Sequence, residues 1–376
     1  YKTNEGRAKI IASLQELGVN SYRFSIEWSQ IEPKEGEWNE TNLQVYVDLC
    51  KALRGAGIAP MVSLHHFSAP LWFHENGSFE KEENIDAFIR FSEKVFEALT
   101  TKSWGGTPLV EHFCTINEPG IEAFSRFIRG AFSPGCFMNF KRAACFLKGA
   151  LKAHCLVYDK LKQNAPKSVK IGIVHQYLKF VPTNPLIFPT THYLTRFIND
   201  ASLNFFRTGK FEFKMPFVNV TDENMPKPKT DFVGCQYYVR PVIGMMGPTG
   251  YHAPMTEMPF AEDPEGLYEA IIETHKAYKA PVIVTENGIS TNDEEQRARY
   301  IPRALYAAQQ AQKEIGDENF LGYYLWCFTD NFEWDMGMNP QRFGAFSKDG
   351  FLKEGAKVYA NILNAWRKAS EEDEEI

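Results

Sequence analysis

The stretch TNLQVYVDLCKALRGAGIAPMVSL, residues 41–64, contains the unit that decides the fold. Apolar residues recur every three or four positions in its first half, which predicts a helix over 41–54. These residues are Leu43, Val47, Cys50 and Leu53. Gly55 ends the helix, and the apolar run at 58–64 predicts a buried strand directly after it. The chain therefore passes from a helix into a strand through a short turn.

The same unit recurs along the whole chain. Six further helix–strand pairs are predicted at 3–18 with 19–25, 84–100 with 111–117, 140–163 with 169–175, 194–208 with 231–236, 265–279 with 281–285, and 293–315 with 320–326. A last helix is predicted over 354–368. Strands that alternate with helices form parallel sheets, so the pattern predicts an α/β fold.

The number of strands favours a barrel. Seven strands can be counted, and eight would close a (β/α)8 TIM barrel. Because the chain opens on a helix, we expect the first strand of the barrel to lie before residue 1. A length of 376 residues without a Gly/Ser-rich linker predicts one domain over 1–376. A doubly wound open sheet is the alternative, although no glycine-rich phosphate loop follows any strand.

Composition and charge exclude some classes of binding partner. With 44% hydrophobic and 23% charged residues the chain can bury a large core. Five of its 47 acids lie in the last six positions, which leaves 41 basic against 42 acidic residues elsewhere, so 370–376 is predicted to be a solvated acidic tail. Without a basic excess we expect no nucleic-acid partner. No run reaches the roughly 18 apolar residues of a membrane span, so we expect no membrane contact.

The seven cysteines indicate whether the protein works in a reducing or an oxidising compartment. They are an odd number, without CxxC spacing or a neighbouring metal-ligand pattern, which favours a reducing, cytoplasmic location and predicts no metal site. The oligomeric state is left open by the sequence.

Polar residues gather at the predicted strand ends, where the catalytic groups of a (β/α)8 barrel lie. They include Arg23, His65, His66, Asn117, Glu118, Gln236, Tyr237, Tyr238, Glu286, Asn287, Trp326, Glu333 and Trp334. Glu118 in TINEP and Glu286 in VTENG form a carboxylate pair suited to acid/base or nucleophilic work on a bond between them. The alternative is that each glutamate only caps the helix that follows it.

These segments resemble glycoside hydrolase family 1, the β-glucosidase family, over nearly the full chain. The resemblance is carried by YRFSIEW at 22–28, LHHFSAP at 64–70, TINEP at 115–119, FVGCQYY at 232–238, VTENG at 284–288 and LWCFTDNFEW at 325–334. It implies a retaining exo-β-glycosidase that hydrolyses terminal β-D-glucosides, or β-galactosides, by double displacement. The expected substrate is a small β-glycoside or an oligosaccharide, and no cofactor is expected.

The resemblance also implies a role for each matched residue. Glu118 corresponds to the general acid/base and Glu286 to the nucleophile. Asn117 and His66 correspond to contacts with the sugar 2-OH and 3-OH. The other matched residues are Arg23 and Tyr238, which hold the nucleophile, and Trp326, Glu333 and Trp334, which form the floor of the sugar pocket. Independently, a guanidinium beside Glu286 would keep it ionised, and that charge would raise the pKa of Glu118.

Departures from the family pattern concern specificity. Gln236 stands where the family usually has Asn, and Phe67 and Ser68 stand where Trp and Asp are usual. Phe343 is a further candidate, either for stacking on a sugar or for ordinary packing. The family's first strand, with its sugar-binding Gln, has no counterpart in these residues.

Two other functions are compatible with parts of the pattern. A non-catalytic sugar-binding relative would keep the barrel as a recognition module. A metal-dependent hydrolase could use His65 and His66, but the carboxylate ligands it needs are not clustered. Adjacent histidines at a strand end point to opposite sides, so His65 is interpreted as structural.

Overall fold

The computed structural model describes residues 1–249, 253–258, 261–337 and 341–374. Within these residues the central sheet has seven parallel strands. They are β1 (Ser21–Ser25), β2 (Ala59–His65), β5 (His112–Asn117), β6 (Lys170–Gln176), β10 (Phe232–Gln236), β13 (Val282–Asn287) and β14 (Phe320–Leu325). Their spatial order follows the chain order, as in a (β/α)8 barrel. The doubly wound alternative, whose strand order reverses at a switch point, is wrong.

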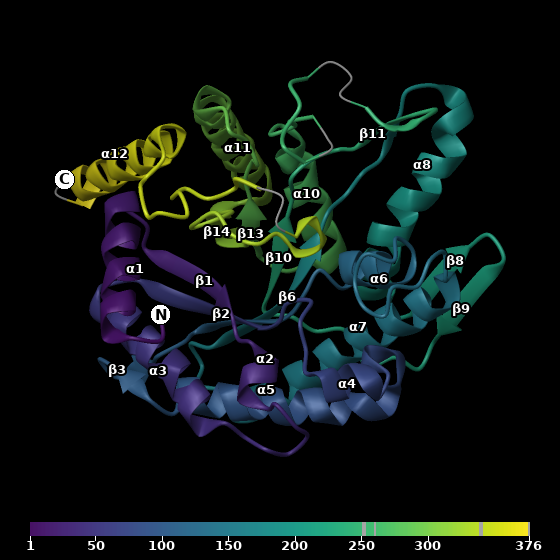
Figure 1. Ribbon diagram of the computed structural model, residues 1–376, viewed down its shortest axis with the longest axis horizontal. Coiled ribbons are helices and arrows are strands. Elements are labelled where there is room, and N and C mark those ends of the chain that lie inside the picture. The colour runs from purple at the N-terminus through teal and green to yellow at the C-terminus, as the bar shows by residue number, and fades with distance from the viewer. Residues whose placement is uncertain (250–252, 259–260, 338–340, 375–376) are drawn as a thin grey trace.

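Helices surround the sheet (Figure 1). The long helices are α1 (Asn4–Leu17), α3 (Glu40–Gly55), α5 (Ile85–Thr100), α7 (Phe140–Lys162), α10 (Gly266–Tyr278), α11 (Glu294–Ile315) and α12 (Lys357–Glu374). The shorter ones are α2 (Trp28–Ile31), α4 (Leu71–Glu75), α6 (Pro119–Phe127), α8 (Phe188–Thr195) and α9 (Ala201–Thr208). A π-helical turn, η4 (Arg196–Asp200), joins α8 to α9, so this helical segment begins before the predicted 194–208.

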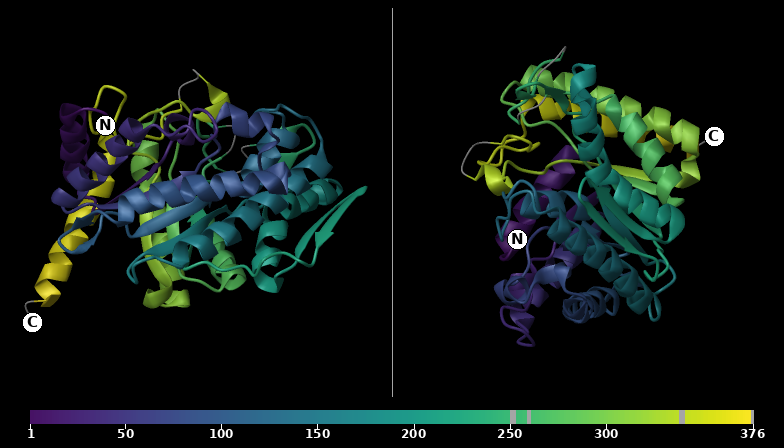
Figure 2. Two further views of the ribbon diagram at one scale, coloured as in Figure 1. Left: turned by 90° about the horizontal axis from the view of Figure 1, so that it is seen from below. Right: turned by 90° about the vertical axis from the view of Figure 1, so that its right-hand side faces the viewer.

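Small elements lie in the connections. They are the strand pairs β3 (Ser103–Trp104) with β4 (Thr107–Pro108) and β8 (Phe211–Met215) with β9 (Val218–Asp222), and the strands β7 (Val181–Pro182), β11 (Val242–Gly244) and β12 (Gly247–Pro248). Single 3-10 turns are η1 (Ser78–Glu80), η2 (Glu82–Asn84), η3 (Pro185–Ile187), η5 (Asp317–Asn319), η6 (Trp334–Met336) and η7 (Glu354–Ala356). The β8–β9 hairpin and α12 project at opposite ends of the molecule (Figure 2).

Two layers of apolar side chains hold the barrel together. Alternate residues of each strand face inward, and an inner cluster fills the barrel with Met61, Cys114, Val174, Phe232 and Ile283. The other residues of each strand face the helices and belong to the larger outer core. Val62 and Leu64 of β2 are examples. The strand ends are thus supported from both sides.

The predicted end of the last helix is wrong. Helix α12 continues through Glu374, so residues 370–374 are helical, whereas the helix was expected to end at 368. Glutamate is a good helix former, and neither Gly nor Pro interrupts the segment. Residues 375–376 lie outside the described residues. None of the described helices has the length and apolar character needed to cross a bilayer.

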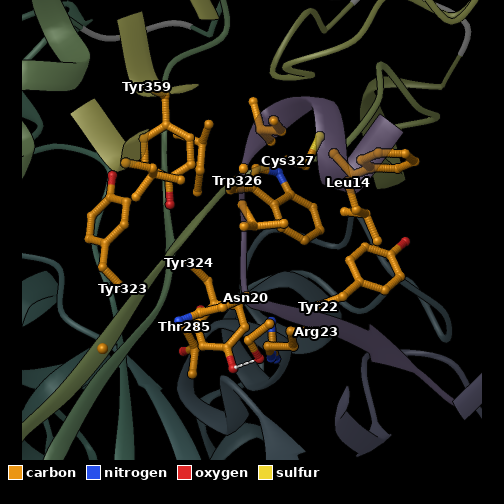
Figure 3. Close-up of a pocket in the computed structure, with 18 of the residues that line it drawn as sticks. Leu14, Asn20, Tyr22, Arg23, Thr285, Tyr323, Tyr324, Trp326, Cys327 and Tyr359 are labelled. Carbon is orange, nitrogen blue, oxygen red and sulfur yellow. Dashed lines mark hydrogen bonds between the residues drawn. The ribbon is translucent and has the colours of Figure 1, made fainter. Parts of the chain in front are cut away.

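The sheet, as described, is open between β1 and β14, its two edge strands. A cavity of about 630 Å³ lies in this opening, lined by both strands and by α1 and α12 (Figure 3). The hydroxyls of Ser21 and Tyr324 meet across it at 2.5 Å, and Arg367 of α12 donates to the carbonyl of Gly18. Seven strands therefore form a nearly closed barrel, and an eighth strand remains a prediction.

Candidate active site

Two buried carboxylates lie at the C-terminal ends of β5 and β13, two strands that β6 and β10 separate in the sheet. Glu118 directly follows β5 and is 5% exposed, and Glu286 is part of β13 and is 4% exposed. Burial, and next the negative charge of Glu286, raise the pKa of Glu118 well above its ordinary value, although Arg23 opposes this. Its surroundings therefore favour the protonated form of Glu118 over the ionised form.

Glu286 is held by two donors. Nη1 of Arg23, from β1, lies 2.5 Å from Oε1, and the hydroxyl of Tyr238, after β10, lies 2.6 Å from Oε2. Burial, and next the charge of Glu286, raise the pKa of Tyr238 well above 10, so the phenol keeps its proton and donates it. With one donor on each oxygen, the carboxylate is fixed in one orientation and balanced by a guanidinium.

Asn117 is the last residue of β5, and its side-chain oxygen is held by two donors. Its Oδ1 accepts from Nη2 of Arg23 at 2.6 Å and from Nε2 of Gln236 at 3.0 Å. Its Nδ2 and the Oε1 of Gln236 are buried and lack a partner among the described residues. Buried polar atoms are normally paired, so these two atoms are suited to hydrogen bonds with a ligand.

Glu118 has an unusual backbone conformation. Its φ of 42° and ψ of 59° are left-handed, which for a side chain of this size costs about 1–3 kcal/mol. Its N–H donates to the carbonyl of Val174 at 3.0 Å, and Pro119 begins α6 immediately after it. Gln176, with its amide nitrogen directed at Glu118, lies 2.8 and 3.0 Å from the two carboxyl oxygens. Glu118 is thus held by β6 through both backbone and side chain.

Aromatic residues and His66 form the adjoining wall. His66 lies 5.2 Å from Trp334 and 6.3 Å from Trp326 between ring centroids, and its Nδ1 lies 3.0 Å from Oγ of Ser25. Burial, and next the charge of Arg23, lower the pKa of His66, so the ring is neutral. The 630 Å³ cavity reaches this wall, since Arg23, His66 and Trp326 line it (Figure 3).

Glu333 and Phe343 complete the predicted set. Burial, then Glu286 and Asp335, raise the pKa of Glu333 to about 7, so this acid titrates near neutrality. Phe343 is buried and meets Tyr238 edge-on at 5.7 Å, which is a packing contact behind the residue that holds Glu286.

The two adjacent histidines diverge, as predicted. Nε2 of His65 lies 2.8 Å from Oε2 of Glu122, a buried residue of α6, whereas His66 faces the pocket. No group of three His, Cys, Asp or Glu suited to a metal occurs in the part of the chain that the structure describes. His65 and His66 thus have different partners, Glu122 and Ser25.

Some polar residues near the site were not found from the sequence. Gln176 lies one residue beyond the strand predicted at 169–175, so a strand end placed one position later would have revealed it. Glu122 and Arg126 are four residues apart on α6 and have the pattern of an ordinary exposed ion pair, yet both are buried.

The fold and the site together define a (β/α)8-barrel glycoside hydrolase. Comparison with known families agrees: residues 7–364 match glycosyl hydrolase family 1, and the chain belongs to this family. Among curated proteins it is 26% identical to a β-galactosidase from Sulfolobus acidocaldarius, over 93% of this chain and 82% of that protein. It is also 26% identical to a 6-phospho-β-galactosidase from Staphylococcus epidermidis, over 93% and 86%.

Solved structures agree on the fold. A β-glycosidase from Pyrococcus horikoshii superposes with a TM-score of 0.82 at 28% identity, over 96% of this chain and 84% of that one. A β-glucosidase from Thermotoga maritima in complex with deoxynojirimycin gives a TM-score of 0.83 at 25% identity, over 95% and 85%. The prediction of a (β/α)8 barrel and of a glycoside hydrolase is confirmed.

Proposed function

We propose that this protein is a retaining exo-β-glycosidase that removes a terminal β-D-glucose, or β-D-galactose, from a small glycoside or an oligosaccharide. The observation that carries the proposal is the difference between two neighbouring carboxylates. Glu286 is balanced by Arg23 and Tyr238, whereas Glu118 is buried beside that charge and keeps its proton. One acid and one anion are the pair that double displacement needs.

In the first step Glu286 attacks the anomeric carbon and the bond to the leaving oxygen breaks, while Glu118 gives its proton to that oxygen. The products are a glycosyl ester on Glu286 and the free aglycone. In the second step Glu118, now ionised, takes a proton from water, which attacks the same carbon and releases Glu286. Since the ester has no charge, the repulsion that raised the pKa of Glu118 is absent when it acts as the base.

The sugar is bound by the polar atoms left unpaired. We assign the 2-OH to the unpaired Nδ2 of Asn117 and the 3-OH to His66, and place the sugar ring over Trp326 and Trp334. Glu333 would accept hydrogen bonds from hydroxyls farther round the ring. A phosphate at the 6-position would bring like charges beside Glu333, Glu286 and Asp335, so we propose an unphosphorylated sugar.

Three further points are part of the proposal. We propose that residues 1–376 act as one domain, that the substrate is a small molecule, and that the protein works in the cytoplasm, where its seven cysteines stay reduced.

The experiment is a screen of 4-nitrophenyl β-glycosides, followed by proton NMR of the first sugar formed from a β-glucoside. We expect turnover of the glucoside or galactoside, with the β-anomer appearing first. An initial α-anomer would contradict the assignment of Glu286 as the nucleophile. Binding of a glucose-like inhibitor without turnover of any glycoside would support a non-catalytic sugar-binding relative instead.

A further inference from the structure

A buried ionic cluster lies behind the pocket wall, outside the residues that would touch the sugar. Glu122, from the first turn of α6, is 0% exposed. Its Oε2 lies 2.8 Å from His65, and its Oε1 accepts from Nε of Arg126 at 2.8 Å. Burial would raise the pKa of Glu122, but His65 and Arg126 outweigh it and lower the pKa to about 2. Glu122 is therefore an anion at every working pH.

Arg126 joins this cluster to two loops at the barrel mouth. It donates to the carbonyl of Phe67, after β2, at 3.1 Å, and to the carbonyl of Ser133, after α6. The ring of Phe67 meets Trp334 at 4.9 Å, and the ring of Phe132 meets Trp334 at 6.0 Å. One buried guanidinium thus fixes both loops that support Trp334.

The cluster also fixes the backbone of Glu118. The N–H of Glu122 donates to the carbonyl of Glu118 at 3.0 Å, and the side chain of Glu122 anchors the same turn to His65 of β2. Glu118 is held in a left-handed conformation, with φ of 42°, that its own side chain does not favour. Phe67, whose carbonyl Arg126 holds, also has a positive φ, of 62°. Both strained residues are therefore restrained by the cluster.

Stability alone is a weak reason for such a cluster. Buried ion pairs can often be replaced by apolar residues without loss of stability, because desolvation offsets their attraction. A requirement for fixed geometry gives a stronger reason, since a catalytic group displaced by about 1 Å can lose on the order of 10²-fold in rate.

We propose that Glu122 and Arg126 are positioning residues, which hold Glu118 where it can protonate the leaving oxygen. The inference rests on the proposed role of Glu118 as the acid/base. It predicts that loss of the cluster lowers kcat/KM most for substrates whose leaving oxygen most needs that proton.

The test compares Glu122→Gln and Arg126→Lys with the wild type on two substrates, methyl β-glucoside and 2,4-dinitrophenyl β-glucoside. We expect kcat/KM to fall about ten- to hundredfold on the methyl glucoside and less than about threefold on the dinitrophenyl glucoside, whose leaving oxygen needs no proton. The pH profile should keep its position, because Glu122 is not among the groups that shift the pKa of Glu118.

Asp231→Asn is the matched control. Asp231 is a partly buried carboxylate that precedes β10, at the other end of the barrel, and it accepts from Lys162 and from the N–H of Ile171. Its loss should lower thermal stability without a difference between the two substrates.

Equal losses on both substrates, or no loss on either, would overturn the inference and leave a structural role only. If Glu122→Gln does not fold, Arg126→Lys decides, since it keeps the positive charge but loses the Nε donor that holds Glu122. A wild type without turnover of any β-glucoside would overturn the proposed function, and this inference with it. Wild-type turnover with equal losses in the variants would overturn the inference alone.

Discussion

Replacing Glu118 by alanine separates the acid role from every other role of this residue. A positioned general acid contributes about 10²–10⁴ in rate, which corresponds to about 3–5 kcal/mol of transition-state stabilisation. This contribution exists only where the leaving oxygen needs a proton. We therefore expect kcat/KM to fall by about 10²–10⁴ on methyl β-glucoside and by far less on 2,4-dinitrophenyl β-glucoside.

The pH dependence supplies a second readout of the same variant. Burial and the charge of Glu286 raise the pKa of Glu118, so wild-type kcat/KM on methyl glucoside should fall as pH rises through that raised value. Glu118→Ala has no such group, and its residual kcat/KM should lack this alkaline limb. The Nε2 amide of Gln176 loses its acceptor in the variant but carries no charge, so it creates no new titration.

The assay is initial-rate kinetics from pH 4 to 10, with kcat/KM as the quantity compared because it reports on formation of the glycosyl ester. Gln176→Ala is the control, since it removes the partner of Glu118 and leaves the acid in place. Equal losses on good and poor leaving groups, or an alkaline limb that survives in Glu118→Ala, would refute the assignment of the acid.

Other substitutions test the rest of the site. Glu286→Ala should abolish turnover of both glucosides, because no ester can form; measurable turnover of the dinitrophenyl substrate would contradict the nucleophile assignment. Glu333→Gln should reduce kcat/KM on β-glucosides more at pH 8 than at pH 6, since the pKa of Glu333 is about 7, and efficient turnover of a 6-phosphoglucoside would contradict this view of the pocket. Glu118→Gln should raise the melting temperature at pH 8 and change it little at pH 4. The pKa of Glu118 is higher in the folded wild type than the value of about 4.3 expected in the unfolded chain. The resulting contribution to stability is fully present below a pH of about 4.3 and is lost as the pH rises through the pKa of the folded state. Calorimetry of both proteins at the two pH values decides.

Most of the framework could be predicted from the sequence because it follows from periodicity. Helix 41–54 and strand 58–64 were placed within one residue at most boundaries, as α3 and β2 show. The rule that catalytic groups end barrel strands singled out Glu118 and Glu286 among 47 acids. Local patterns sufficed because these features depend on neighbours in the chain.

What could not be predicted depends on contacts between distant segments. Helix α6 has only nine residues, too few for a periodic pattern, so nothing marked Glu122 as buried. The partners of Arg126 come from the loops that follow β2 and α6, and no sequence spacing reveals that these loops meet. Likewise, the assignment of His65 as structural followed from strand alternation, but its partner Glu122, 57 residues away, did not.

The left-handed backbone of Glu118 has a consequence for evolution of this protein in the laboratory. Asparagine and glycine tolerate that conformation, and neither places a carboxyl group in the buried site. Both should therefore be selected at position 118 when thermostability is the only property selected. A library screened for thermostability alone would then accumulate folded and inactive clones at this codon. Selection that alternates heating with glycoside cleavage should keep glutamate there and find its gains elsewhere in the barrel.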